Sequence, residues 1–486
     1  MNGESFDRRT VLRAGLGAGL ALTAVGCAGS KALTAAAATP DWSELDRLVL
    51  GGIYRPGMTG YTAMYELFDP MYDSVHPAAV IRAATVNDVR QSVLFAGRNN
   101  LVCVPKSGGH SYVGASSVQG GMVIDVRALK SISYKSGVVA VGAGAKLYDV
   151  HVALDRYGQS LPTGTCPTVG VAGLALGGGM GPDTRAFGLT SDRIASLDVV
   201  LPDGRLVTAS AAENPDLFWA LRGGGGGNFG IVTQIRFRTI QARTVGTFSL
   251  QWPQSRAAAV VRGWQRFARE APNTYWANLH LDARSDGTIA VRAIGVSRTG
   301  SATAAAALLE SMIGSRATSR SFAVRSHLAA VRYLGGGTTS PRTGFTSGSD
   351  VLRAPMDAAT INSLIAVVAA RARAGATASA LLDPLGGLSA SPTAGGSCWP
   401  WRSALGVIQW YVGLAAHPSS ANYNSARQWI TNGHHAVAGF SAGGYVNYVE
   451  PSRSVASYYG ASWARLQQVR ATYDPTRFFH SAYGIT

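Results

Sequence analysis

Short apolar runs alternate with polar turns marked by glycine or proline through the first half of the chain. Runs of about four to eight residues rich in Val, Ile and Leu are typical of buried strands. We expect strands at 78–82, 122–126, 138–141, 197–201 and 231–237. The turn at 202–204 and the apolar run at 206–208 predict a hairpin with the strand before them.

Helical spacing fills the intervals between these strands. Thr85 precedes a helical pattern as an N-cap residue, and a second helix is expected at 216–221. Residues 41–69 also mix apolar and charged positions at helical spacing. This alternation of strands and helices up to about residue 240 favours an α+β or α/β fold.

The pattern changes between about residues 243 and 440. Strands are expected at 245–252, 278–281, 289–294, 379–383 and 405–414, and helices at 257–270, 302–313 and 357–373. This order predicts a separate domain in which helices back an antiparallel sheet. Residues 335–349 are rich in Gly, Thr and Ser and are expected to form a loop.

The composition indicates a globular protein with a substantial core. The 486 residues are 47% hydrophobic and only 14% charged. The net charge of +16 raises the question of nucleic-acid binding. The basic residues are scattered, however, and no helix-turn-helix, zinc-finger or RNA-binding pattern is present in the sequence. We therefore interpret the charge as a property of the surface and expect no nucleic-acid partner.

Cysteine and histidine spacing does not favour a metal site. No Cys-x-x-Cys occurs, and the adjacent His434 and His435 cannot both face one ion on a helix or a strand. We expect no metal. Cys103 and Cys398 either pair as a disulfide or remain as buried free thiols, and the sequence leaves both readings open. A hydrolase is not favoured either, because no G-x-S-x-G elbow is present.

Residues 1–38 have the features of an export signal. Arg8 and Arg9 precede an apolar, Gly- and Ala-rich run at 14–26, which is typical of a twin-arginine signal read by the Tat translocase. That run is shorter than the roughly 20 residues that a membrane-spanning helix needs. We expect export to the periplasm, cell envelope or medium. Either cleavage follows Ala38, or Cys27 is lipidated to give a lipoprotein.

Two glycine-marked loops carry the candidate chemistry. Residues 106–112 read K-S-G-G-H-S-Y, and residues 162–170 read P-T-G-T-C-P-T-V-G. Glycines allow the backbone to turn tightly and to present N–H groups to an anion. His110 and Cys166 project from these two loops.

The two motifs together resemble those of the berberine bridge enzyme-like branch of the vanillyl-alcohol oxidase flavoproteins. The resemblance runs from about residue 76 to the C-terminus and is weakest in the middle. It implies an α+β fold with a two-subdomain, PCMH-type FAD-binding domain at 39–242. It also implies a substrate-binding domain at 243–440 and a segment at 441–486 that returns to the FAD-binding domain.

The resemblance further implies FAD as a bicovalently bound cofactor, linked by His110 at the 8α-methyl group and by Cys166 at C6. The loop at 222–232 is similar to a third family motif that completes the cofactor cradle. The expected cofactor-binding residues are His110, Cys166, Lys106, Ser107, Gly108, Gly109, Ser111, Gly114, Thr165, Thr168, Val169, Gly170, Gly173, Asn228, Gly230, Ile231 and Val232. Backbone N–H groups and the Ser107 hydroxyl would bind the pyrophosphate.

The implied reaction is hydride transfer from a C–H bond to flavin N5, with a base that takes the hydroxyl proton. Tyr448 of the family's Y-x-N-Y is the first candidate for this base, and Tyr445 is the second. Residues three apart on a strand point to opposite faces, so only one of them should reach the ring unless a bulge intervenes. Gln409 lies where some members carry a glutamate base, and it could hydrogen-bond the substrate or Tyr448. Positive surroundings of the flavin are expected to lower the pKa of the tyrosine.

The expected substrate is an alcohol, either the anomeric hydroxyl of a sugar or a hydroxyl of a natural product. O2 is the expected acceptor, because family members with a valine three residues after the linking cysteine behave as oxidases, and that residue here is Val169. One alternative is a dehydrogenase with another acceptor. A second is a flavin-bearing binding protein without turnover. Near the C-terminus, Arg477 replaces the family's usual asparagine.

Overall fold

Two sheets in the first half of the chain share one hydrophobic core. The computed structural model describes residues 40–391, 396–481 and 483–486, and residues 41–486 form one compact unit. The expected export signal, including Cys27, lies outside the described residues. In the part of the chain that the structure describes, no helix has the length and apolar character needed to cross a membrane.

The first sheet is mainly parallel. Its strands, in spatial order, are β1 (Ile53–Tyr54), β2 (Ala79–Arg82), β4 (Met122–Asp125) and β3 (Cys103–Lys106). Helices α1 (Trp42–Asp46), α2 (Tyr61–Tyr65) and α3 (Val86–Arg98) accompany it. The Thr85 hydroxyl accepts a hydrogen bond of 3.2 Å from Asp88 N and caps α3, as predicted. The region 41–69 contains only two short helices rather than a continuous one.

The second sheet is antiparallel and includes the predicted hairpin. Its spatial order is β5 (Ile132–Lys135), β6 (Val138–Gly142), β10 (Ile231–Arg238), β8 (Ile194–Val200) and β9 (Leu206–Ser210). Around it lie α4 (Leu147–Asp155), α5 (Val171–Leu176), α6 (Thr184–Phe187) and α7 (Pro215–Ala220), with a small pair of strands, β7 (Gln159–Ser160) and β11 (Ile240–Gln241). The loops that follow β3 and precede α5 are the two glycine-marked motifs.

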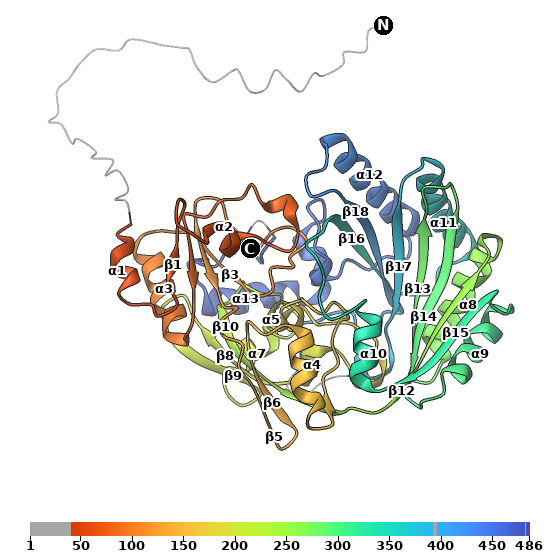
Figure 1. Cartoon of the computed structure of the whole chain (residues 1–486), viewed down its shortest axis with the longest axis horizontal. Helices are drawn as coiled ribbons and strands as arrows, with labels where there is room; N and C mark the ends of the chain where they lie inside the picture. The colour runs from red at the N-terminus through yellow and green to blue at the C-terminus, as the bar shows by residue number, and fades with distance from the viewer. Residues whose placement is uncertain (1–39, 392–395, 482) are drawn as a thin grey trace, which may run out of the picture. The chain divides into compact units, whose positions relative to one another are not determined.

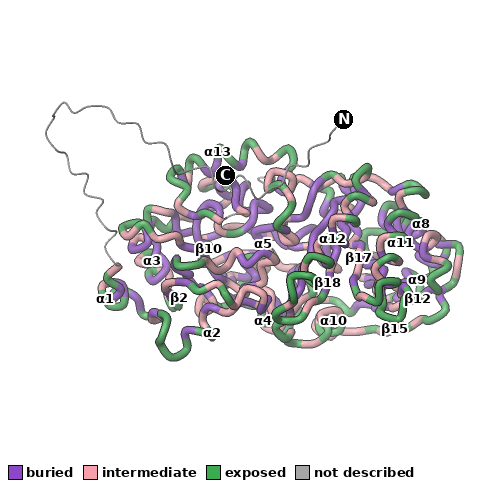
Figure 2. The backbone as a smooth tube through the Cα atoms, turned by 90° about the horizontal axis from the view of Figure 1, so that it is seen from above, coloured by how far each residue is buried: buried purple, intermediate pink, exposed green. Residues whose placement is uncertain are grey.

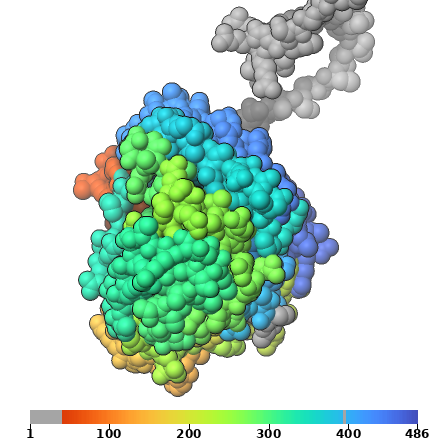
Figure 3. All heavy atoms as spheres, turned by 90° about the vertical axis from the view of Figure 1, so that its right-hand side faces the viewer, coloured from red at the N-terminus to blue at the C-terminus, as the bar shows by residue number. Residues whose placement is uncertain are grey.

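The third sheet confirms the expected antiparallel sheet backed by helices. Its order is β15 (Ser319–Arg325), β12 (Val245–Trp252), β14 (Ile289–Ser297), β13 (Tyr275–Ala283), β17 (Ala378–Pro384), β18 (Gly406–Leu414) and β16 (Gly344–Leu352). On one face lie α8 (Ala257–Glu270), α9 (Ala302–Ile313), α11 (Ala358–Arg373) and α12 (Ser420–Val437) (Figure 1). Figure 3 views this side, where these green to blue segments form most of the surface. The fold is α+β, as the family resemblance implied.

The prediction of a loop at 335–349 was wrong for its second part, because strand β16 begins at Gly344. All nine residues of β16 are buried. Its small polar residues are satisfied inside the protein. The Ser347 hydroxyl donates to the Trp410 carbonyl (2.8 Å), and the Ser349 hydroxyl accepts from Tyr445 N (3.0 Å). A side chain at Gly348 would collide with Glu450. Ser, Thr and Gly therefore serve close packing here, not loop formation.

Because successive side chains of a strand point in opposite directions, β16, β17 and β18 present different sets of residues on the two faces of the sheet. Helix α12 covers one face, to which Asp350 and Trp410 belong. The strand pairings Ser349–Gln409, Leu381–Gln409 and Asp383–Val407 show that Asp383 and Gln409 share the opposite face. Buried residues concentrate along the interior strands, whereas exposed residues follow the outer helices and turns (Figure 2).

The C-terminal segment crosses the free edge of β16. Ala442 N donates to the Val351 carbonyl (2.8 Å), and Val351 N donates to the Gly443 carbonyl (2.9 Å). The chain then forms a short 3-10 helix, η5 (Val446–Tyr448), so the expectation that Tyr445 and Tyr448 lie on one strand was wrong. It ends with α13 (Trp463–Tyr473), which packs against α7 in the first half of the chain.

Candidate functional site

One cavity of about 460 Å³ brings the sequence motifs together. Its wall comes from the loop after β3, the loop into α5, the loop after α7, strands β16 and β18, and the C-terminal segment. The FAD-binding region, the third sheet and the last 45 residues therefore all contribute to it.

The two glycine-marked loops meet at a point that excludes side chains. A Cβ atom on Gly108 would lie 2.2 Å from Gly170 N, and a Cβ atom on Gly170 would lie 2.2 Å from the Ser107 hydroxyl. At Gly173, in contrast, a Cβ atom would meet no atom within 4 Å and would enter the cavity. Glycine is thus required at the contact between the loops and keeps the cavity open beside them.

The backbone of this cradle suits a phosphate-bearing group. Among the described residues, the N–H groups of residues 108–111 have no protein acceptor. They lie in a tight turn in which Gly109 has a φ of +70°. Successive free N–H groups in such a turn bind anions. The residues present therefore fit the pyrophosphate of FAD.

His110 and Cys166 line the same cavity, although 55 residues separate them in the sequence. The His110 ring stacks on Phe68, with centroids 4.0 Å apart, and its Nε2 lies 3.1 Å from the Thr168 hydroxyl. Burial lowers the pKa of His110 to about 4, so the imidazole is neutral near pH 7. The Cys166 thiol lies 3.7 Å from the same Thr168 hydroxyl. Thr168 thus contacts both candidate linking residues.

Most of the expected cofactor-binding residues lie on the cavity wall. Those on the wall are His110, Cys166, Ser107, Gly108, Gly109, Ser111, Val169, Gly170, Gly173, Asn228, Gly230 and Val232. Those that do not line it are Lys106, Gly114, Thr165, Thr168 and Ile231. Gly114 instead supports a turn at φ +67° against Tyr72, and Thr165 lines a separate small cavity.

The Lys106 and Ser107 side chains of the first motif have structural partners in the protein, although the Ser107 hydroxyl was expected to bind the pyrophosphate. Lys106 Nζ donates to the carbonyls of Met64 (2.7 Å) and Glu66 (2.6 Å), and burial lowers its pKa to about 7. The Ser107 hydroxyl donates to the Ala143 carbonyl (2.6 Å). The side chains of Lys106 and Ser107 thus hold the loop, and its backbone N–H groups are left to bind the pyrophosphate.

The three candidate catalytic residues occupy different positions. Tyr448 lines the cavity, and its ring stacks on Tyr112 with centroids 5.3 Å apart. The Tyr445 hydroxyl lies off the cavity wall and accepts hydrogen bonds from Gly179 N (2.9 Å) and Asn447 Nδ2 (2.8 Å). Gln409 donates to the Tyr112 hydroxyl (3.0 Å) instead of to Tyr448.

The expected positive surroundings of the tyrosine are absent. The described wall contains no Lys, Arg, Asp or Glu side chain. Burial, followed by the neighbouring Tyr112 and Asp383, raises the pKa of Tyr448 well above its ordinary value. The expectation that the site lowers this pKa was therefore wrong for the protein alone.

Asp383 is a functional candidate that the sequence did not reveal. It lies on β17, on the same sheet face as Gln409, and accepts a hydrogen bond of 2.7 Å from Asn278. Burial raises its pKa to about 6. Strand alternation would have placed Asp383 beside Gln409 only if the pairing of β17 with β18 had been known.

An aromatic wall was also missed. Phe345 and Tyr411 stack with centroids 5.5 Å apart, and Tyr112 meets Phe345 edge-on at 4.8 Å. All three line the cavity. Phe345 lay in the segment that was expected to form a loop, whereas Tyr112 is the last residue of the first motif and could have been considered.

The remaining cysteines and histidines have other surroundings. Cys103 and Cys398 are buried free thiols, so the disulfide alternative was wrong. His434 lies between two carboxylates, and the adjacent His435 is exposed.

Comparisons with known proteins agree with this geometry. Residues 77–210 match the family described as FAD binding domain, and residues 444–486 match the family described as berberine and berberine like. An uncharacterised FAD-linked oxidoreductase of Bacillus subtilis is 29% identical over 420 residues, which cover 84% of this chain and 91% of the relative. The chitooligosaccharide oxidase of Gibberella zeae is 29% identical over 441 residues, covering 84% and 87%.

Among solved structures, the berberine bridge enzyme-like protein 1 of Physcomitrella patens superimposes with a TM-score of 0.83 at 25% identity, over 91% of this chain and 98% of that one. The sequence matches cover the cofactor-binding region and the C-terminal segment, whose residues line one cavity. The protein is an FAD-dependent oxidoreductase, and over most of its length it is similar to the berberine bridge enzyme-like FAD-linked oxidases.

Proposed function

We propose that the protein is an oxidase that removes hydride from the carbon bearing a sugar hydroxyl, with bicovalently bound FAD and with O2 as acceptor. The observation that carries this proposal is the convergence of His110, Cys166 and Tyr448 on one cavity. Relatives named chitooligosaccharide oxidase, xylooligosaccharide oxidase and carbohydrate oxidase support a sugar as the substrate.

The backbone N–H groups of residues 108–111 would hold the pyrophosphate, and His110 and Cys166 would hold the ring. Bound FAD supplies a two-electron acceptor for the hydride. The neutral His110 ring suits a nucleophile, because an imidazolium has no free lone pair with which to form a bond. Its Nε2 faces the Thr168 hydroxyl, which leaves Nδ1 for the link.

We assign Tyr448 as the group that takes the proton of the substrate hydroxyl. Its raised pKa keeps the hydroxyl protonated in the resting protein. It therefore needs a partner that accepts its own proton as it takes the proton of the substrate. Asp383 is ionised above about pH 6 and acts on Tyr448 electrostatically, so we propose Asp383 as that partner.

The cavity wall favours an uncharged substrate. No Lys, Arg, Asp or Glu side chain lines the described wall, so a charged ligand would lose its hydration without gaining an oppositely charged partner from these residue types. The stacked pair Phe345 and Tyr411 offers the apolar faces on which sugar rings pack. We therefore propose a neutral sugar rather than a charged natural product.

The covalent links can be tested by acid precipitation. The yellow colour should stay with the precipitated protein in the wild type and in His110→Ala and Cys166→Ala, each of which keeps one bond. Only the double variant should release flavin into the supernatant. Release from the wild type would contradict the covalent proposal.

The reaction can be tested by mixing the oxidised enzyme anaerobically with a panel of neutral and acidic sugars and simple alcohols. Bleaching of the flavin by neutral sugars is the expected result. Bleaching by none of them would favour a binding protein without turnover.

We further propose that the protein is exported by the twin-arginine route. The support is the sequence of residues 1–38, which lie outside the described residues. This route carries folded proteins, so it would allow the cofactor to be inserted before export.

A further inference from the structure

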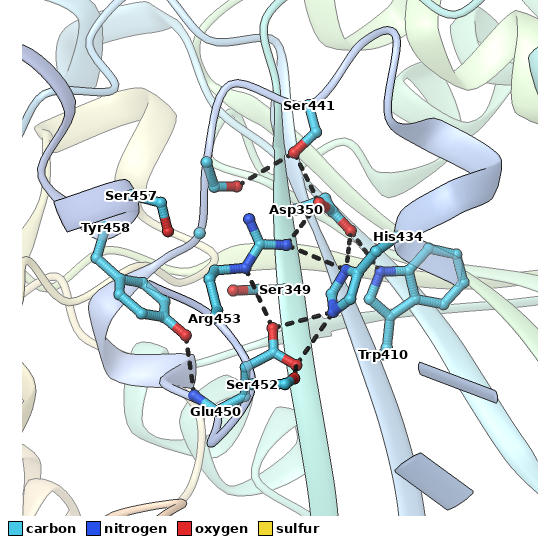
Figure 4. Close-up of polar contacts among 12 residues, drawn as sticks. Ser349, Asp350, Trp410, His434, Ser441, Glu450, Ser452, Arg453, Ser457 and Tyr458 are labelled. Carbon is cyan, nitrogen blue, oxygen red and sulfur yellow. Dashed lines mark hydrogen bonds and ion pairs between the residues drawn. The ribbon is translucent and has the colours of Figure 1, made fainter. Parts of the chain in front are cut away.

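A cluster of charged side chains, among them Asp350, His434, Glu450 and Arg453, lies between β16, α12 and the C-terminal segment (Figure 4). It joins Asp350 of β16, Arg427 and His434 of α12, and Glu450 and Arg453 of the C-terminal segment. The side chains of Asp350 and Glu450 are only 2% and 0% exposed. Buried carboxylates of this kind are stable only when they are fully paired.

The contacts of His434 favour a ring that carries two protons. Its Nδ1 lies 2.6 Å from Asp350 Oδ2, and its Nε2 lies 3.0 Å from Glu450 Oε1. An ionised carboxylate can only accept a hydrogen bond, so each ring nitrogen is satisfied as a donor; Arg453 Nη2, a donor 3.1 Å from Nδ1, is farther away than Asp350 Oδ2. A neutral imidazole has one N–H and would leave a lone pair against one carboxylate. His434 is therefore an imidazolium that bridges β16 and the C-terminal segment.

The bridge lies on the opposite side of the β16 edge from the cavity. The chain pairs with Val351 through Ala442 and Gly443, crosses the edge and brings Tyr448 to the cavity wall. Two residues later, Glu450 lies against Gly348 on the helix-covered face. The crossing segment is thus fixed at its far end by the pairing of Glu450 with His434.

The cluster reaches the cavity by a second route. Trp410 Nε1 donates to Asp350 Oδ2 (2.8 Å). The neighbouring Gln409 donates to the hydroxyl of Tyr112, the ring that stacks on Tyr448. Asp350, the partner of His434, is therefore also bonded to the strand that contacts the aromatic ring stacked on Tyr448.

We propose that His434 is a positioning residue for Tyr448, and that its bridging imidazolium holds the crossing segment in the geometry required for proton removal. This inference rests on the proposed role of Tyr448. It assigns a function in the reaction to a histidine that has no contact with the cavity.

The proton on His434 makes this device sensitive to pH. Burial alone lowers the pKa of His434, but hydrogen bonds and charges from Asp350 and Glu450 outweigh it and raise the pKa to about 9. Two arginines oppose the extra positive charge on His434. Arg453 Nη2 lies 3.1 Å from its Nδ1, and Arg427 is paired with Glu450. The support is complete below the ordinary pKa of histidine, near 6.5, and is lost as the pH rises through about 9.

The test is the anaerobic rate of flavin reduction, measured by rapid mixing with a saturating sugar between pH 6 and pH 10. We expect the wild-type rate to fall above about pH 9. Titration of Tyr448 itself would have the opposite effect, because its phenolate is the stronger base. His434→Gln should lower the rate at pH 7 by about 10- to 100-fold, the scale of a misplaced catalytic group, and should lack the alkaline fall.

His435→Gln is the matched control, because His435 is the next residue of α12 and is exposed. It should keep the wild-type rate and pH profile. Flavin content and the unfolding midpoint should be measured for both variants. A His434→Gln enzyme with the wild-type rate, or with a lower rate at every pH and an unchanged alkaline fall, would overturn the proposal.

A second variant decides the matter if His434→Gln does not fold. Glu450→Gln removes one of the two carboxylates, so the alkaline fall should move to lower pH; an unmoved fall would contradict the proposal. Tyr448→Phe separates this inference from the proposed function. Loss of activity in Tyr448→Phe together with wild-type behaviour of His434→Gln would refute only the positioning role. Full activity of Tyr448→Phe would refute the assignment of the base.

Discussion

At the scale of single residues, the cavity combines reactive groups with the absence of charged side chains on its described wall. His110 is neutral, Tyr448 is protonated, and the charge of the Asp383 carboxylate helps to raise the pKa of Tyr448. The reaction must therefore depend on which of these groups can give up or accept a proton. The pKa shifts predict in which direction the rate of flavin reduction changes with pH.

Asp383 should set the acid limb of the reaction. Burial raises its pKa to about 6, and only the ionised form can accept a proton from Tyr448. Anaerobic flavin reduction should therefore be full above about pH 7 and should decline as the pH falls through about 6. Asp383→Asn should lower the plateau by about 10²-fold, the scale of a lost proton acceptor, and abolish this limb.

Gln409→Glu provides the contrast to this change, because it adds a carboxylate beside Tyr112 and leaves Asp383 in place. The acid limb near pH 6 should survive in that variant. An acid limb that is unchanged in Asp383→Asn would exclude Asp383 as the proton acceptor.

Val169 should control the reaction with oxygen. It lines the cavity three residues after Cys166, and its backbone is fixed by a hydrogen bond from Leu147 N to its carbonyl (3.0 Å). A leucine would therefore add a methylene to the cavity side of a rigid loop, and a space of the size of O2 is easily filled. Val169→Leu should slow reoxidation of the photoreduced flavin by at least about tenfold.

The rate of anaerobic reduction is the internal control for Val169→Leu and should stay at the wild-type value. Val232→Leu, at another valine of the cavity wall, tests whether any added volume has the same effect. Slow reoxidation in the wild type would favour the dehydrogenase alternative.

At the scale of elements, the predictions that failed concern residues whose types are compatible with more than one kind of secondary structure. Gly, Ser and Thr at 344–349 favour a loop in isolation, yet they form a buried strand because their hydroxyls find partners across the sheet. Tyr445 and Tyr448 were expected on a strand, yet Tyr445 precedes a 3-10 helix and Tyr448 is its last residue. Long amphipathic helices such as 257–270 and 302–313 were predicted to the residue, because their periodicity has one reading.

The turn after α13 has a substitution that the backbone does not favour. Arg477 has a φ of +55°, and the Asp474 carboxylate accepts from the N–H groups of Phe478 (2.7 Å) and Phe479 (3.0 Å). Asparagine tolerates this left-handed region better than arginine does. Arg477→Asn, the residue usual in the family, should therefore raise the unfolding midpoint by about 1 °C.

Thr476→Asn is the matched control for this stabilisation. Thr476 is also exposed, but it is not among the residues with positive φ. It should leave the midpoint unchanged in a thermal-shift measurement. Equal shifts in the two variants would indicate an effect of composition rather than of backbone conformation.

At the scale of the whole molecule, the loops of the cofactor cradle could be predicted from the sequence, whereas the part of the cavity formed by the third sheet could not. The cradle depends on short motifs in which glycine, histidine and cysteine have few alternative roles. That part of the cavity depends on contacts among β16, β17, β18 and the C-terminal segment. No local sequence pattern determines which residues of these strands pair. Asp383, Phe345 and His434 could therefore be recognised as candidates only from the structure of the sheet.

The proposed export by the twin-arginine route concerns the whole chain. The apolar run at 14–26 is interrupted by glycines and follows Arg8 and Arg9, which the twin-arginine route requires as a pair. Replacing both with lysine preserves the positive charge and removes only the guanidinium groups. The doubly substituted protein should accumulate in the cytoplasm with its flavin attached, as measured by fractionation and in-gel flavin fluorescence. Replacing Arg13 with lysine should leave export intact, and unchanged export of the Arg8→Lys, Arg9→Lys protein would refute this route.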